Sequence, residues 1–178
     1  MKLFAFLLSM LVSVPLLYSQ EKVPTPLKSL SIDFDKDDVK WDLQHRAGNA
    51  QKIIAEFTPK GQKIRAWKEM VAHEITFTKD SLKEHYDKWK KMVKGADPKI
   101  VLKEATSTDE NIVVIYQSIA FNEYAIRRFI KAPDGIYALA YHTRLNTYNK
   151  DRVLLWTKII PASKLAANPL LQKDKKRE

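Results

Sequence analysis

Four side chains suited to anion binding flank one predicted turn. Arg128 precedes the segment Pro133-Asp134-Gly135, and Tyr141, His142 and Arg144 follow it. Proline presets φ and glycine accepts positive φ, so this segment predicts a hairpin that brings the four residues onto neighbouring strands. An arginine beside a histidine and a tyrosine could hold an anion. The alternative, a cross-strand salt bridge with an aromatic pair, is the more common arrangement and is favoured.

Aspartates at alternate positions suggest calcium at first sight. Asp33, Asp35 and Asp37 match the first three ligands of a calcium loop. However, Asp38 stands where the turn needs glycine, and Gln44 stands where the loop needs a bidentate glutamate. We therefore interpret the segment as an acidic, solvated lead-in to the first strand.

Other metal and cofactor sites lack support in the sequence. The chain has no cysteine, which excludes disulfides, thiolate metal sites and a cysteine nucleophile. Four glycines, without a G-x-G or G-K-[ST] motif, exclude a glycine-rich phosphate loop. The four histidines show no H-E-x-x-H or similar spacing, and His73-Glu74 would point to opposite faces of a strand. The sequence thus predicts neither a metal nor a cofactor.

Catalytic serine chemistry is equally poorly supported. There is no G-x-S-x-G motif, and Ser81 is best explained as a helix cap. Carboxylates such as Glu56, Glu74 and Glu123 could meet across a sheet, but each is more often a partner for an arginine. No catalytic residue is predicted. A hydrolase with a site of dispersed histidine, arginine and carboxylate residues remains the alternative.

The clearest element is a helix over residues 81–94. Leu82, Tyr86, Trp89 and Val93 recur at helical spacing and predict its buried face. Ser81 and Glu84 form a capping box, Gly95 is expected to be a left-handed C-terminal cap, and five lysines cover much of the remaining surface.

The remaining elements are mainly strands. A second amphipathic helix is expected at 150–160, closed by Pro161. Alternating apolar residues predict strands, or strand-like segments, at 38–46, 51–58, 70–78, 99–106, 111–119, 122–131 and 135–143. This order indicates an α+β fold with a largely antiparallel sheet of about six strands, flanked by helices.

Several segments resemble the Mog1/PsbP-like α/β/α sandwich found in small exported bacterial proteins of unknown function. The resemblance rests on EFTPKGQKIRAWKEM (56–70), on RRFIKAPDGIYALAYHTR (127–144), and on Trp156 with Ile159, Ile160 and Ala162 after it. It covers residues 38–162 in outline. The resemblance implies a fold and a lack of known enzymatic activity, and it transfers no functional residues.

The two ends of the chain differ in composition and pattern from its middle. Lys2 followed by the apolar run 3–18 predicts a secretory signal peptide at 1–19, with an uncleaved membrane anchor as the alternative. Residues 20–31 are expected to be a linker, 32–162 a single α+β domain, and 163–178 a polar basic tail. No transmembrane span is expected after signal cleavage, so the protein would be periplasmic or secreted.

The net charge of +10 bears on possible partners. Lysine outnumbers arginine 24 to 7, and nucleic-acid readers rely on the planar fork of arginine, so nucleic acid is an unlikely partner. A polyanionic surface or an envelope protein fits better, although the lysines could simply maintain solubility. The sequence favours an exported, non-enzymatic binding or accessory protein of the bacterial envelope or extracellular space. It leaves the partner and oligomeric state open.

Overall fold

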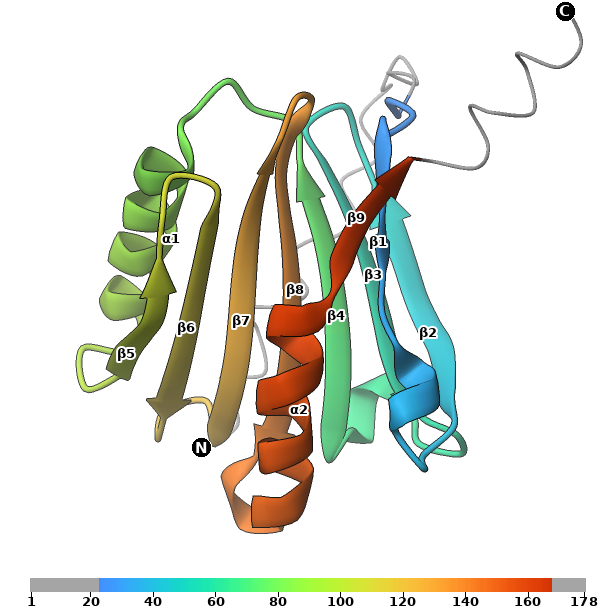
Figure 1. Cartoon of the computed structure of the whole chain (residues 1–178). Helices are drawn as coiled ribbons and strands as arrows, with labels where there is room; N and C mark the ends of the chain where they lie inside the picture. Colours follow the sequence, from blue (N-terminus) through green and yellow to red (C-terminus); the bar gives the residue numbers. More distant parts are fainter. Residues whose placement is uncertain (1–22, 168–178) are drawn as a thin grey trace, which may run out of the picture.

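A seven-stranded antiparallel sheet forms the centre of the molecule in the computed structural model, which describes residues 23–167 (Figure 1). The strand order is β2-β3-β4-β8-β7-β6-β5, and every neighbouring pair is antiparallel. The strands are β2 (Trp41–Gly48), β3 (Lys52–Pro59), β4 (Glu69–Thr76), β5 (Val101–Ser107), β6 (Asn111–Ser118), β7 (Glu123–Ala132) and β8 (Gly135–Arg144). The expected α+β class is confirmed, with seven strands in this sheet rather than about six.

Two helices cover opposite faces of this sheet. Helix α1 (Leu82–Ala96) packs against the face that carries Phe129, whereas α2 (Lys150–Ala162) packs against the face that carries Ile126. Successive strand residues alternate between faces, so odd-numbered Phe129 and even-numbered Ile126 of β7 necessarily serve different layers. In Figure 1, α2 lies over the middle of the sheet and α1 lies behind its β5–β6 side.

Helix α1 begins as its sequence predicts. The Ser81 side chain accepts a hydrogen bond from the backbone N–H of Glu84, and the Glu84 carboxylate accepts one from the backbone N–H of Ser81. Leu82, Tyr86 and Trp89 are buried against the sheet, as their spacing indicates.

The predicted end of α1 is wrong. Gly95 lies inside the helix, which continues to Ala96 and has Asp97 as its C-cap. The Asp97 N–H donates to the carbonyl of Val93 at 2.8 Å, and this bond extends the last turn without a left-handed residue. Helix α2 likewise ends two residues later than expected, with Pro161 accommodated in its last turn.

The segments expected to be linker and tail form structure. Strands β1 (Lys28–Ser31) and β9 (Lys164–Ala167) pair antiparallel in a separate two-stranded sheet, with Leu30 opposite Leu165. The boundaries predicted at 31 and 163 therefore need correction, because Lys28–Ser31 and Lys164–Ala167 are strands that pair with each other. The predicted signal peptide at 1–19 lies outside the described residues, as do the tail residues from 168 onward.

The β7–β8 turn is the hairpin that its sequence predicts. Gly135 has a φ of +154°, and a Cβ atom there would lie 2.2 Å from the carbonyl oxygen of Thr76. Glycine is required at this position because β4 lies directly beside the turn. The short 3₁₀ helices η1 (Phe34–Lys36), η2 (Ile64–Ala66) and η3 (Leu145–Thr147) complete the described elements.

Candidate functional site

The four predicted ligand-binding residues lie on neighbouring strands but on opposite faces of the sheet. Arg128 and Tyr141 face α2, where they contact Ser163 and Trp156. His142 and Arg144 lie on the other face, beside Trp67. The structure therefore does not gather the four side chains into one anion site, and their role in binding stays a prediction.

Arg128 stabilises the end of α2. Its Nε donates to Oδ1 of Asn111 at 2.6 Å, and Nη1 donates to the carbonyl of Pro161 at 2.8 Å and to that of Ser163. The last carbonyls of a helix lack partners within the helix, so a guanidinium placed there satisfies them. Burial lowers the pKa of Arg128. These contacts give Arg128 a structural role at the end of α2.

His142 belongs to a buried hydrogen-bonded group on the α1 face. Its Nδ1 lies 2.8 Å from Oε1 of Glu123, which also accepts a hydrogen bond from the Tyr116 hydroxyl at 2.8 Å. Burial raises the pKa of Glu123, but His142 and Tyr116 outweigh this effect and hold that pKa below its usual value. Nε2 of His142 is buried without a hydrogen-bond partner in the described part of the chain.

The other two predicted residues form stacks. The Tyr141 ring is parallel to the Trp156 ring within 6°, with centroids 4.9 Å apart. The Arg144 guanidinium lies 3.8 Å from the centre of the Trp67 ring and donates to the carbonyl of Phe121 at 2.9 Å. Stacks of this kind hold loops and helices in place, and each is typically worth about 1 kcal/mol.

Sequence reasoning missed a charge cluster around Arg152. This guanidinium donates to both carboxylate oxygens of Asp37, and to Oε2 of Glu69 through Nε at 3.0 Å and Nη2 at 2.8 Å. Asp37 is buried and also accepts from the indole N–H of Trp41 at 2.9 Å. The interpretation of Asp37 as part of a solvated segment is therefore wrong.

Electrostatics in this cluster favour the charged forms. Burial works to raise the pKa of Asp37, but hydrogen bonds from Arg152, Val39 and Trp41 lower it overall. Arg152 lies 115 residues from Asp37 in sequence, so no local pattern could have paired them. The cluster ties α2 to the connection between β1 and β2.

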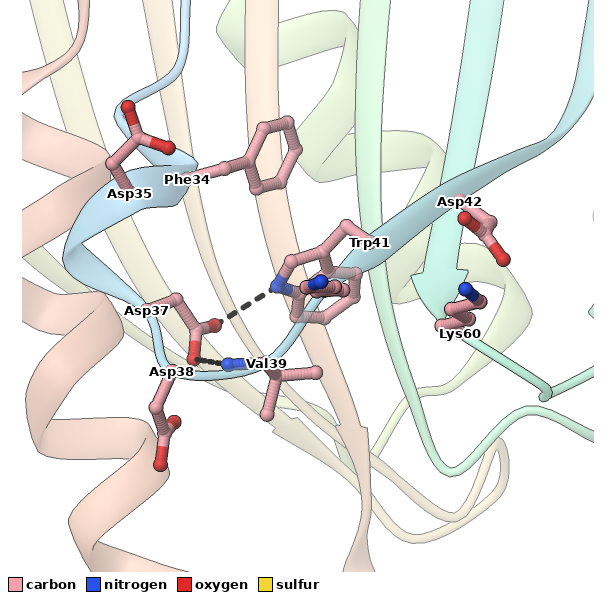
Figure 2. A pocket seen from close by; sticks show the side chains of 9 residues that line it. Phe34, Asp35, Asp37, Asp38, Val39, Trp41, Asp42 and Lys60 are labelled. Carbon is pink, nitrogen blue, oxygen red and sulfur yellow. Dashed lines mark hydrogen bonds between the residues drawn. The ribbon is translucent and has the colours of Figure 1, made fainter.

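Two open hollows lie next to this cluster. One, of about 500 Å³, is lined by Phe34, Asp35, Asp37, Asp38, Val39, Lys40, Trp41, Asp42 and Lys60. Figure 2 shows Asp37 turned toward Trp41 and Val39, which it already bonds. The other hollow, of about 310 Å³, shares Asp38 and is lined partly by α2. Within residues 23–167 no group of three or more histidine, aspartate and glutamate side chains could hold a metal ion.

A row of ionisable and small residues crosses the α1 face. The strand register aligns Arg127, Ala140, Ala72 and Glu56 on β7, β8, β4 and β3. Glu56 is only 4% exposed, and its Oε1 has no hydrogen-bond partner in the described chain. Burial raises the pKa of Glu56, although the positive charges of His45, His142 and Lys52 oppose this.

Within this row, the Arg127 guanidinium is paired with a carboxylate. Its Nη2 donates to Oε2 of Glu74 at 3.1 Å, and the Lys52 ammonium lies 2.9 Å from the same oxygen. Burial works to raise the pKa of Glu74, but these two cations lower it to about 2. These contacts place two cations and one carboxylate together on this face of the sheet.

A basic and apolar corner lies at the C-terminal end of α1. We call it the basic tip, and its exposed residues are Lys91, Met92, Lys94, Lys99, Val101 and Ile119. Asp97 holds the corner together, since it accepts from the Ser118 hydroxyl at 2.5 Å and from the backbone N–H of Lys99 at 3.0 Å. These bonds join the α1–β5 loop to the β6–β7 turn, which lie at the same end of the sheet in Figure 1.

Comparisons with known proteins add no relative. No family model, curated protein or solved structure matches this chain. Among the described residues, no helix is both long and apolar enough to cross a membrane.

Proposed function

We propose that the protein is an exported, non-enzymatic binding or accessory protein of the bacterial envelope or extracellular space. The observation that carries the proposal is the use made of the reactive side chains. Arg128 satisfies carbonyls of α2, Arg152 joins Asp37 to Glu69, and His142 is held by Glu123. Side chains committed to such contacts support architecture, and the exposed surface is left for binding.

Export is proposed from the sequence of residues 1–19, where one lysine precedes a long apolar run. Mass spectrometry of the protein recovered from the periplasm or medium tests this. We expect an N-terminus at Gln20 or within two residues of it. An intact Met1 in a membrane fraction would show that the segment is retained as an anchor, and a chain confined to the cytoplasm would refute export.

The Mog1/PsbP-like relationship belongs to the same proposal. An antiparallel sheet between helices on its two faces supports it, as does the position of Trp156 on the closing helix. An experimental structure, compared element by element with members of that fold class, would test the relationship.

The alternative is a hydrolase, and one observation favours it. Glu56 has a pKa that burial raises, and it lies on the sheet face that also carries His142, so a carboxyl group and an imidazole share one layer. A panel of ester, amide, glycoside and phosphoester substrates tests this idea. Turnover that is lost in both Glu56→Gln and His142→Asn, while thermal unfolding stays cooperative, would favour the enzyme over the binding protein.

A further inference from the structure

The basic tip combines exposed apolar side chains with exposed lysines. Ile119, Val101 and Met92 are 73%, 64% and 58% exposed, which is high for large apolar residues. Single exposed apolar residues are common, but Ile119 and Val101 both adjoin the hydrogen bond between Asp97 and Ser118: Ile119 follows Ser118 in the β6–β7 turn, and Val101 begins β5 after the α1–β5 loop. Met92 lies on α1, whereas Val101 precedes the α1-facing Leu102 and so points to the other face of the sheet.

The charge near the C-terminal end of α1 is mainly positive. The segment 88–103 contains six lysines and a single acidic residue, Asp97. Asp97 is buried, and its carboxylate is occupied by Ser118 and by the backbone of Lys99. The exposed lysines Lys91 and Lys94 have no ion pair within residues 23–167, so their charge is available to a partner.

The other half of α1 differs. Lys83 pairs with Asp87 at 2.5 Å and Lys88 with Asp80 at 2.7 Å, so carboxylates accompany these lysines. Lys90 is also engaged, at 3.1 Å from Glu104. The unpaired positive charge thus concentrates at the C-terminal end of the helix, where the apolar residues lie.

We propose that the basic tip docks the protein onto an anionic lipid surface. Ile119 and Val101 enter the region between head groups and acyl chains, and the lysines contact the head groups. The inference deepens the proposed function and rests on it, because it names the partner of an exported binding protein.

The chemistry of the tip selects lipid over other polyanions. An acidic polysaccharide would use the lysines but offers nothing to the exposed isoleucine and valine side chains. Lysine supplies point charges on flexible stems, which suit a fluid array of head groups better than fixed, bidentate recognition does. Binding of this type combines buried apolar area with attraction to anionic lipid.

The experiment uses the exported chain as the cell releases it, with its N-terminus determined by mass spectrometry. Because the chain has no cysteine, Ile119→Cys can carry a single environment-sensitive dye. Leu43→Cys is the matched control, since Leu43 is 51% exposed on β2 at the opposite edge of the sheet. The dye reports insertion locally, so a retained N-terminal anchor cannot mimic it.

On vesicles that contain phosphatidylglycerol, we expect the dye at Ile119 to shift to the blue, whereas the dye at Leu43 does not. Phosphatidylcholine vesicles should produce neither shift. The response at Ile119 should weaken steeply as salt rises past about 0.15 M, where the Debye length is near 8 Å. No shift at Ile119, or an equal shift at both positions, would overturn the inference.

The lysines are tested as a set. Lys91→Gln, Lys94→Gln and Lys99→Gln together should weaken vesicle binding roughly 100-fold, since each lysine near an anionic surface contributes about fivefold. The control replaces Lys63, Lys79 and Lys158 by glutamine, which removes the same charge from other exposed positions. Equal losses in both triple variants would mean non-specific attraction and would refute a docking tip.

The experiments distinguish failure of the lipid inference from failure of the proposed function. A chain found outside the cytoplasm that leaves vesicles unbound but is captured by an acidic protein or polysaccharide contradicts only the lipid inference. A chain that never leaves the cytoplasm contradicts the proposed function, whatever it does with vesicles. Unchanged far-UV circular dichroism and thermal midpoints must accompany each variant, and the tip residues are exposed enough for this to hold.

Discussion

At the scale of single residues, Arg152 forms ion pairs with three carboxylates, those of Asp37, Asp38 and Glu69. Its partner Asp37 is buried, so removal of the guanidinium leaves a buried carboxylate without its cation. We expect Arg152→Ala to lower the free energy of unfolding by about 3 kcal/mol, the usual cost of breaking a buried pair. Chemical denaturation measures it. Lys36→Ala removes an exposed charge from the same region and should change little.

The pH dependence of the same pair has a definite sign. The pKa of Asp37 is lowered in the folded protein, so its contribution to stability is present above the unfolded value near 4 and is lost as pH falls below it. Arg152→Ala should therefore flatten the loss of stability as the pH falls below about 4. An unchanged acid limb in that variant would contradict the assignment.

Glu56 should behave in the opposite way. Its pKa is raised by burial, so ionisation opposes folding as pH rises above the unfolded value near 4. We expect Glu56→Gln to stabilise the protein by about 1 kcal/mol at pH 7 and to have no such effect at pH 4. Thermal unfolding at both pH values measures this. Glu110→Gln, on an exposed carboxylate, is the control, and destabilisation by Glu56→Gln at pH 7 would show that the charge is needed.

At the scale of elements, α1 depends on its aromatic face. Trp89 is buried and packs edge-on against Phe129 with ring centroids 5.2 Å apart. Trp89→Ala should cost about 3–5 kcal/mol of unfolding free energy. Lys91→Ala should stay within about 0.5 kcal/mol, because Lys91 is exposed and unpaired in the described chain. Lys90 is a poorer control, since it pairs with Glu104 and lies over Tyr86.

Two glycines provide an opposite pair of tests. Gly95 lies inside α1, its φ is not among the positive values, and a Cβ atom there would meet nothing within 4 Å. Gly95→Ala should stabilise the protein by about 0.5–1 kcal/mol, because alanine favours the helix. Gly135→Ala should destabilise it strongly, since Cβ would collide with the Thr76 carbonyl. Destabilisation by Gly95→Ala would instead indicate that Gly95 adopts the left-handed conformation expected from the sequence.

The helices and strands show how much of the fold can be predicted from the sequence. Helix α1 was predictable because Leu82, Tyr86 and Trp89 repeat within a few turns and Ser81 caps locally. Its end was mispredicted because the bond from Asp97 to Val93 competes with a left-handed Gly95, and both endings look alike in sequence. The strands were also predictable, because apolar residues alternate locally within each of them. The candidate site did not. Tyr141 and His142 are adjacent in β8 and so face opposite sides of the sheet, and the strand register decides which of them shares a face with Arg128.

At the scale of the whole molecule, the two ends of the described chain are held together. Lys28 lies opposite Ala167, and the Tyr137 hydroxyl donates to the Lys28 carbonyl at 3.2 Å. Sequence could not reveal this contact, because both segments are short, contain no strong alternation and lie at opposite ends of the chain. The same distance in sequence hid the pairing of Asp37 with Arg152.

The β1–β9 sheet makes the domain depend on residues beyond the compact middle. We expect a chain that stops after Ser163 to lose about 2 kcal/mol, as the backbone hydrogen bonds of β1 lose their partners and Leu30 is uncovered. For a chain of this size, the melting temperature should fall by roughly 4–8 °C. A chain that stops after Ala167 keeps β9 and serves as the control. Equal melting temperatures for the two truncated chains would mean that β9 contributes nothing, and that the domain ends where the sequence first suggested.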